Sequence, residues 1–408
     1  MTALAPAQPT DTVRPAYREP TFLRYVAGHS VSVLGDQVWY VALSWMAVRL
    51  ASPAVAGVIL AVSSLPRLAL LLLGGAIVDR YGPRRLMIGS DLLRAVISLG
   101  AAGAALAAPG VPLLVTVALV FGLADAVFLP AAGALAPRLL HPDQIASGVG
   151  TTTLAARAAL TIGAPLGGVL VATGGLPLAC LVNAATFVVS VASLASVRPR
   201  PAASRSGPRE PLLGALRAGL AYLVRHRLLR VLLLVTLLTN LGFVGPMNVG
   251  LALVSTARGW AAAGIGDMLA GFGVGAVTGA LLMMRVRSGS GGRVVAAVCA
   301  AVQGGAVFTI AVAPHLWTAV LATTLTGLTS GPLAIVVTSL TQRFTDDRFR
   351  GRVASVNTLA NLGVTPMAMA VMGAIAGQLG NVPAFASSAG LELAAGLMCI
   401  LWLRVPAP

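Results

Sequence analysis

The stretch Gly75-Ala76-Ile77-Val78-Asp79-Arg80-Tyr81-Gly82-Pro83-Arg84-Arg85 gathers four charged residues between two long apolar segments. The segment before it, residues 53–78, contains a single ionisable residue, Arg67. The segment that begins at Leu86 is apolar again within a few residues. A chain that crosses a bilayer, turns in water and crosses back must collect its charges in the turn. The stretch therefore predicts a membrane hairpin.

The composition of the whole chain also indicates a membrane protein. Hydrophobic residues make up 57% of the 408 residues, charged residues make up only 10%, and the mean hydropathy is +0.89. A soluble domain of this composition would have too few polar groups to cover its surface. The 46 glycines fit helices that pack closely in lipid, where small residues let backbones approach. The expected class is an all-α polytopic membrane protein.

The positive charge is distributed over short loops. The formal net charge is +16, and all 28 basic residues are arginine. A nucleic-acid-binding protein needs a contiguous basic surface, whereas these arginines are scattered between apolar segments, so we expect no nucleic-acid partner. One set of alternate loops holds only Arg49 and Arg258, and the other set holds the remaining loop arginines. The positive-inside rule then places both termini in the cytoplasm, with the chain in the inner or plasma membrane of the cell.

Twelve segments are long and apolar enough to span a bilayer. They are residues 22–50, 54–78, 86–108, 112–136, 146–172, 175–197, 228–256, 262–284, 294–313, 315–340, 350–378 and 383–404. We expect two pseudo-symmetric six-helix bundles, because the halves resemble degenerate copies at an offset of roughly two hundred residues. The predicted parts are a cytoplasmic tail (1–21), an N-terminal bundle (22–197), a cytoplasmic linker (198–227), a C-terminal bundle (228–404) and a short tail (405–408).

The linker is expected to begin as flexible chain and to end in an amphipathic helix. Residues 198–211 are rich in Pro, Arg and Ser, which is typical of a loop. In the part of the linker that follows residue 211, leucines recur on one face of a helix and arginines lie on its other faces. This pattern predicts a helix that lies on the inner membrane surface and contacts anionic lipid headgroups. The leucines are Leu212, Leu213, Leu216, Leu220 and Leu223.

From about residue 22 to residue 404, the chain resembles the major facilitator superfamily. The stretch 75–85 is similar to that family's G-x-x-x-D-R-x-G-x-R signature, which lies between the second and third helices. Residues 163–170, Gly-Ala-Pro-Leu-Gly-Gly-Val-Leu, are similar to the G-P-x-x-G-G-x-L signature of drug:proton antiporters. Two positions depart from these patterns. Pro83 stands where the family usually has a basic residue, and Ala164 replaces the Gly of the Gly-Pro pair. Within the family, the chain is most similar to the group of macrolide and siderophore exporters.

The resemblance implies a two-bundle transporter with alternating access, and it assigns roles to both signatures. In the loop, Asp79 can pair with an arginine across the interface between the halves and act as a gate. The alternative is a plain helical hairpin with solvated charges. The expected gating-loop residues are Gly75, Asp79, Arg80, Gly82, Arg84 and Arg85. The residues of the antiporter-like motif are Gly163, Pro165, Gly167 and Gly168.

Ionisable residues inside the apolar segments are candidates for proton coupling, because their burial is costly. The proton-coupling candidates are Asp36 and Asp125, and their expected buried charge partners are Arg67 and Arg157. Arg67 lies at a depth similar to that of Asp36, so the two can form either a titrating pair or a permanent structural one. Arg157 can attract an anionic group of a substrate, but pairing with Asp125 is the favoured interpretation.

Three more ionisable residues lie in apolar segments. Asp91 and Arg94 are about one helical turn apart, so we expect them to pair with each other or with the charged loop. Glu392 lies in the last segment, which by family analogy is peripheral, and the sequence indicates no role for it.

Aromatic and amide side chains on the first and seventh segments are candidates for lining a substrate cavity. For each of them, packing or an interhelical hydrogen bond is the plainer alternative. These candidates are Trp39, Tyr40, Asn240, Phe243 and Asn248.

The sequence favours transport over catalysis. It contains no P-loop and no nucleophile triad or metal-ligand cluster, so we expect neither an enzyme nor a bound cofactor or metal. The expected function is secondary active transport, as proton-coupled efflux of a lipophilic small molecule such as a drug, antibiotic or siderophore. The alternatives are uptake or exchange of a metabolite, or a non-transporting membrane sensor or scaffold. The expected partners of this monomer are the substrate, protons and membrane lipids.

Overall fold

The computed structural model describes residues 15–200, 212–285 and 292–403, and its regular elements there are helices. The N-terminal half contains α1 (Pro20–Leu50), α2 (Pro53–Tyr81), α3 (Pro83–Ala107), α4 (Val111–Leu135) and α5 (Ile145–Ser196), with 3-10 turns at Ala16–Arg18, Ala136–Leu139 and Pro142–Gln144. The C-terminal half contains α6 (Leu212–Arg225), α7 (Arg227–Gly245), the π-helical turn η4 (Pro246–Gly250), α8 (Leu251–Arg258), α9 (Ala261–Arg285), α10 (Gly292–Val312), α11 (Leu316–Arg343), a 3-10 turn (Asp347–Phe349), α12 (Arg350–Leu379) and α13 (Asn381–Leu403).

The reversal between α2 and α3 takes a single residue. Gly82 has φ +80°, ends α2 and directly precedes α3. Such a backbone conformation favours glycine, which has no Cβ to clash. Pro83 follows as the first residue of α3 and is buried. A proline is well suited to the first helical position because its missing N–H would have no partner there. This placement accounts for the proline that interrupts the family's basic pair.

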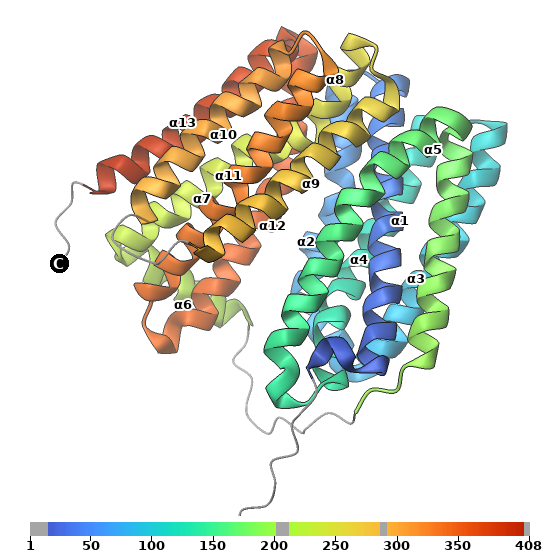
Figure 1. Cartoon of the computed structure of the whole chain (residues 1–408), viewed down its shortest axis with the longest axis horizontal. Helices are drawn as coiled ribbons and strands as arrows, with labels where there is room; N and C mark the ends of the chain where they lie inside the picture. The colour runs from blue at the N-terminus through green and yellow to red at the C-terminus, as the bar shows by residue number, and fades with distance from the viewer. Residues whose placement is uncertain (1–14, 201–211, 286–291, 404–408) are drawn as a thin grey trace, which may run out of the picture.

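The twelve predicted spans map onto fewer continuous helices. Ten helices in the described ranges are long and apolar enough to cross a membrane, and Pro53–Leu68 of α2 forms a shorter apolar one. α5 alone has 52 residues, with Gly175 at φ +64° inside it. A straight helix of that length would measure about 78 Å, more than twice the thickness of a bilayer core. The segments predicted at 146–172 and 175–197 are therefore two arms of α5, which reverses at Gly175 and not through a loop (Figure 1).

The helices form two bundles, α1 to α5 in one and α7 to α13 in the other (Figure 1). The bundles meet mainly where α5 packs along α9 and where α2 packs along α12. A Cβ built on Gly57 of α2 would lie 2.7 Å from the Met369 carbonyl oxygen of α12. A Cβ built on Gly168 of α5 would lie 2.9 Å from the Ala262 carbonyl oxygen of α9. These approaches require glycine, as in other membrane helix interfaces.

Among the residues that the structure describes, the two bundles share a hydrophobic core at one end and have separate cores at the other. One cluster of buried apolar residues runs from Val38 in α1 through Leu60 in α2 to Leu253 in α8 and Met372 in α12. At the opposite end each bundle has its own cluster, around Leu135 in the N-terminal half and around residues of α7, α10 and α11 in the C-terminal half. The molecule is therefore closed at the end of α8 and divided toward the end of α6, where the ribbons diverge (Figure 1).

The amphipathic helix expected in the linker is present as α6, and part of its apolar face packs against protein. α6 contacts α12 and α7. Leu223 is 1% exposed and, with the half-buried Leu216, belongs to the cluster of the C-terminal bundle. Leu220 is 48% exposed. The side chains of Leu212 and Leu213 lie outside the described residues. The C-terminal bundle thus covers part of the face that we expected to contact lipid.

Candidate functional site

An arginine lies at the centre of the N-terminal bundle. Arg94 on α3 is fully buried, and its Nη1 donates to Asp36 on α1, with Oδ1 at 3.2 Å and Oδ2 at 3.1 Å, and to Asp125 Oδ1 on α4 at 3.0 Å. Its Nη2 donates to Asp91 Oδ1, one turn earlier on α3, at 2.5 Å. The guanidinium carbon lies 4.5 Å from the ring centroid of Phe128 and 4.6 Å from that of Phe187. One side chain of α3 thus binds α1 and α4 through ion pairs and α4 and α5 through cation–π contacts.

A second arginine extends these contacts to α2. Arg67 Nη2 donates to Asp125 Oδ2 at 2.5 Å. The side chains of Asp36 and Asp125 are 31% and 21% exposed, whereas those of Asp91 and Arg94 are fully buried. These five residues form what we call the acid–arginine network. Three carboxylates meet two guanidinium groups in it, so the fully ionised network has one negative charge in excess.

The pairings within the network differ in part from those expected from the sequence. Arg67 pairs with Asp125 and not with Asp36, whose partner is Arg94. Arg157 was the favoured partner of Asp125, but Asp125 bonds to Arg67 and Arg94 in the described chain, and Arg157 lines a cavity elsewhere. Depth along a helix follows from the sequence, whereas the direction in which a side chain points also depends on how the helices rotate against each other.

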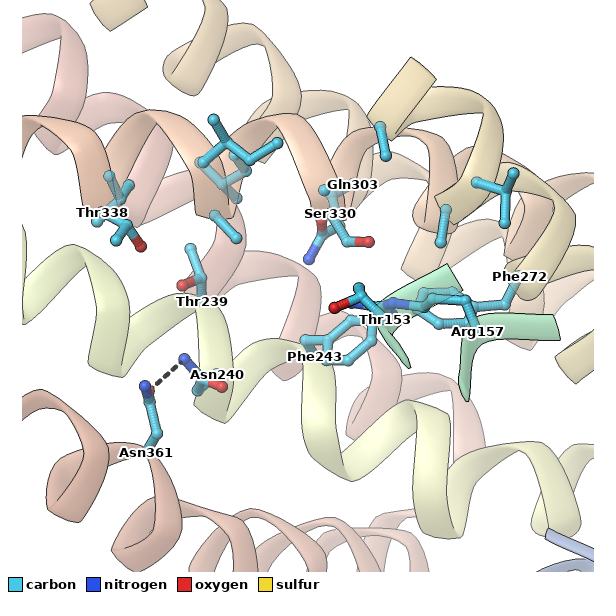
Figure 2. Close-up of a pocket in the computed structure, with 18 of the residues that line it drawn as sticks. Thr153, Arg157, Thr239, Asn240, Phe243, Phe272, Gln303, Ser330, Thr338 and Asn361 are labelled. Atoms are coloured by element: carbon cyan, nitrogen blue, oxygen red, sulfur yellow. Dashed lines mark hydrogen bonds between the residues drawn. The ribbon is translucent and has the colours of Figure 1, made fainter. Parts of the chain in front are cut away.

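A cavity of about 750 Å³ lies in the divided half of the molecule. This volume is in the range of sites for drug-sized ligands. Its walls come from the first arm of α5 and from α7, α9, α10, α11 and α12. The lining is mostly apolar, with Phe243 and Phe272 as its aromatic residues. Its polar side chains are Thr153, Arg157, Thr236, Thr239, Asn240, Gln303, Ser330, Thr338 and Asn361, most of which Figure 2 labels.

The five predicted cavity residues have three different placements. Asn240 and Phe243 line the cavity. Trp39 is 5% exposed and packs against an aromatic ring in the N-terminal core. Tyr40 donates a hydrogen bond to the Asn248 side chain of η4, which links the two bundles in the closed half. For Trp39, Tyr40 and Asn248, the structure thus shows packing or an interhelical hydrogen bond.

Several lining residues were not singled out in the sequence. Asn361 on α12 accepts a hydrogen bond from Asn240 Nδ2 at 2.8 Å, which joins two cavity helices (Figure 2). Gln303 on α10 and Phe272 on α9 also line the cavity. The signal that marked Asn240, an amide inside an apolar span, is also present at Asn361 and Gln303. An amide in an apolar span indicates a side chain that points into the helical bundle, but it does not show whether that side chain lines a cavity or packs in the core.

The charged loop is anchored within its own bundle. Arg84 Nε donates to the Leu194 carbonyl oxygen at 2.8 Å, and Arg84 Nη2 donates to the Ala195 carbonyl oxygen at 2.6 Å. Both acceptors are at the C-terminal end of α5, where carbonyls lack helical partners and a cation is favourable. Arg80 lies over the ring of Tyr81, and Arg85 is exposed. The side chain of Asp79 and the surroundings of Gly75 lie outside the described residues.

The antiporter-like motif lies where α5 packs closely on both α1 and α9. A Cβ on Gly163 would lie 2.8 Å from the Leu34 carbonyl oxygen of α1, and one on Gly167 would lie 2.9 Å from the α1 backbone. Gly168 faces α9 of the other bundle, and a Cβ on Gly266 of α9 would lie 2.8 Å from Pro165 Cα. The small residues of the motif thus allow α5 to pack tightly on α1 and on the opposite bundle at once.

The C-terminal bundle contains a buried acid of its own. Glu392 on α13 is 0% exposed, and its Oε1 accepts a hydrogen bond from Gln303 Nε2 at 2.9 Å. Thr329 on α11 donates to the Gln303 side-chain oxygen at 3.4 Å. Glu392 Oε2 is buried without a hydrogen-bond partner in the described chain. Gln303 thus lies between the cavity and this acid.

Comparison with solved structures identifies the fold. A crystal structure of the nucleoside transporter NupG matches 95% of this chain and 100% of its own with a TM-score of 0.74 and 14% identity. A bacterial homologue of the iron transporter ferroportin, in an inward-facing state, matches 94% of this chain and 99% of its own with a TM-score of 0.71 and 17% identity. At these identities the matches concern the fold alone, and they confirm the expected all-α major facilitator fold.

Comparison of sequences identifies the family. The multidrug efflux pump Tap of Mycobacterium tuberculosis is 26% identical over 414 aligned residues, which cover 97% of this chain and 95% of Tap. Tap of Mycolicibacterium fortuitum is 26% identical over 91% of this chain and 93% of its own. The family model described as transmembrane secretion effector matches residues 13–408. The chain therefore belongs to the transmembrane secretion effector family of the major facilitator superfamily of membrane transporters.

Proposed function

We propose that this transporter exports lipophilic small molecules in exchange for protons. The observation that carries the proposal is the excess of one carboxylate in the acid–arginine network. An uncompensated negative charge at membrane depth is costly, and one bound proton removes it. Asp36 and Asp125 are the proton-binding residues, because their side chains are partly exposed whereas that of Asp91 is not.

The network connects proton binding to the interface between the bundles. Arg94 Nη1 divides its hydrogen bonds between Asp36 and Asp125, so protonation of one strengthens its bond to the other. Asp36 lies on α1, which packs along α5, and Asp125 is bonded to Arg67 on α2. α5 and α2 are the helices through which the two bundles mainly meet. A change in the network thus reaches both contacts along which the bundles rock.

The cavity is the substrate site, and its open end faces the cytoplasm. The divided end of the molecule is the one that holds the charged loop and the linker helix α6, and the arginine distribution supports a cytoplasmic position for both. In this proposal the charged loop closes this end when the bundles rock. The resemblance of the sequence to Tap, a multidrug efflux pump, supports export.

Proton movement in liposomes tests this proposal. The purified protein is reconstituted with a pH-sensitive dye inside, and lipophilic compounds of different charge and class are added one at a time. We expect at least one compound to drive proton movement opposite to its own in the wild type, but not in Asp36→Asn or Asp125→Asn. Asp267→Asn is the matched control, since Asp267 is exposed on α9 and outside the network.

Three outcomes would count against the proposal. Proton movement in the same direction as the compound would support uptake. Wild-type rates in both network variants would remove the proton-binding assignment. A complete absence of proton movement, with folded protein and with every compound class, would favour a non-transporting sensor or scaffold.

A further inference from the structure

The cavity contains one formal charge, and it is positive. Among its lining residues Arg157 is the charged one, and the lining includes neither Asp nor Glu. Arg157 lies twelve residues into α5, which corresponds to a depth of about 18 Å along the helix. A guanidinium group at such a depth is costly unless it meets an anion or water.

The Arg157 side chain is available for a ligand. It is exposed, and it makes no ion pair or side-chain hydrogen bond with any residue that the structure describes. This distinguishes it from the other arginines at membrane depth, Arg67 and Arg94, which are both bonded to carboxylates. Since the acids of the network already have partners of their own, the Arg157 guanidinium is left to water or to a ligand.

The surroundings of Arg157 fit the apolar part of the same ligand. The rings of Phe243 and Phe272 have centroids 5.5 Å apart at an interplanar angle of 42°. Both rings line the same cavity as Arg157 and as Thr153, which lies one turn before Arg157 on α5 (Figure 2). The apolar lining continues with Leu154 and with four residues of α9, which are Ala276, Val277, Ala280 and Leu281. The cavity thus offers a cation, a hydroxyl and two aromatic rings to one ligand.

We infer that the cavity binds amphiphilic organic anions, with Arg157 pairing with a carboxylate or a similar acidic group and Phe243 and Phe272 contacting an aromatic or aliphatic body. This inference rests on the proposed function, since it specifies the substrate class of the same cavity. An arginine can form two parallel hydrogen bonds with a carboxylate, and such charge-assisted bonds are about twice as strong as neutral ones. The same charge disfavours a lipophilic cation, which gives the site selectivity by repulsion.

Two fluorescent probes with the same aromatic group and opposite charge test the inference. Dansylglycine carries a carboxylate and dansylcadaverine an ammonium group. Binding of each is measured by fluorescence polarisation to the purified full-length protein in liposomes of phosphatidylcholine alone, with no proton gradient. We expect the wild type to bind dansylglycine about tenfold or more tightly than dansylcadaverine. Arg157→Gln abolishes that preference and Arg157→Lys keeps most of it.

Controls separate a binding role from a structural one. Arg258→Gln removes an exposed arginine outside the cavity and is expected to leave both affinities unchanged. Without ligand, Arg157→Gln is expected to unfold at the same temperature as the wild type or a higher one, because it removes an unpaired charge. Dansylglycine is expected to raise the unfolding temperature of the wild type and of Arg157→Lys, but not that of Arg157→Gln.

The outcomes distinguish this inference from the proposed function. Equal affinities of the wild type for both probes, or a preference for dansylglycine that survives in Arg157→Gln, would overturn the inference, even if other compounds still drive proton movement. An Arg157-dependent preference without proton movement would uphold the anion site and remove proton coupling. If phosphatidylglycerol added to the liposomes displaces dansylglycine from the wild type, the anion at Arg157 is a lipid headgroup and the substrate assignment is overturned.

Discussion

In the N-terminal bundle, three buried or half-buried acids contact guanidinium groups, whereas in the C-terminal bundle the buried acid Glu392 contacts an amide. Asp36, Asp91 and Asp125 all bond to Arg94. Glu392 bonds to Gln303 and has no cationic partner among the described residues. The three aspartates and Glu392 all lie inside helical bundles of the same fold. Comparing them therefore shows how a guanidinium partner affects a carboxyl group inside a bundle.

A buried cation allows an acid to remain ionised. Close guanidinium groups offset the large desolvation cost of a carboxylate, although removing one partner leaves the other uncompensated. A neutral amide offsets much less of that cost, so a carboxyl group beside it favours its neutral, protonated form. In the proposed mechanism the N-terminal network is therefore the part that exchanges a proton, and we expect Glu392 to keep its proton.

The largest effect is expected from Arg94→Met. This change leaves three carboxylates buried or half-buried around an apolar side chain, so the variant should lose about 3–5 kcal/mol of stability. The measurement is thermal unfolding of the purified protein in detergent at a fixed scan rate. Arg85→Met, which removes an exposed arginine of the loop, is the matched control and should unfold with the wild type. If the two variants unfold together, Arg94 is not the centre that joins α1, α3 and α4.

A smaller loss is expected from Gln303→Leu. The change removes the hydrogen-bond donor of Glu392, whose Oε2 already lacks a partner, and should cost about 1–3 kcal/mol. In the double variant Gln303→Leu with Glu392→Leu, no polar atom of the pair remains buried, so much of the lost stability should return. The same thermal measurement tests both. If the double variant loses more stability than the two single variants lose together, Glu392 and Gln303 do not form a simple neutral hydrogen-bonded pair.

The pair at the edge of the network should show a modest coupling. Arg67 and Asp125 are 34% and 21% exposed, so water already screens their attraction in part. A double-mutant cycle with Arg67→Met and Asp125→Asn should give a coupling free energy of about 1 kcal/mol. A coupling as large as the loss expected for Arg94→Met would mean that Arg67, and not Arg94, dominates the network.

The sequence predicted the fold well because hydropathy and loop charge act along the chain. Apolar length identified the spanning segments, and the resemblance of stretch 75–85 to a family signature indicated the major facilitator fold, which is confirmed. The main difference was the reversal at Gly175, where one positive-φ residue replaces a loop. A glycine followed by more apolar residues does not reveal such a reversal.

The candidate site was less predictable, because partners are decided by helix rotation and by which bundle a face meets. Asp36 and Asp125 were singled out by their depth, yet the central position of Arg94 depends on the packing of three helices. Arg157 was expected to pair with Asp125, and the structure turns it toward the cavity instead. The depth of a residue in the membrane follows from the sequence of its own segment, whereas the composition of a site depends on how several helices pack together.

The smallest effect is expected from Glu392→Gln, and it tests the comparison between the bundles most directly. A glutamine keeps the shape of a protonated glutamic acid and can still accept the bond from Gln303 through its side-chain oxygen. Stability should therefore change by less than about 0.5 kcal/mol, and substrate-driven proton movement should stay at the wild-type level. Asp36→Asn, the corresponding change in the N-terminal bundle, should instead stop proton movement in the same liposome assay. If Glu392→Gln also stops it, Glu392 exchanges its proton during transport, and the lack of a cationic partner does not fix its protonation state.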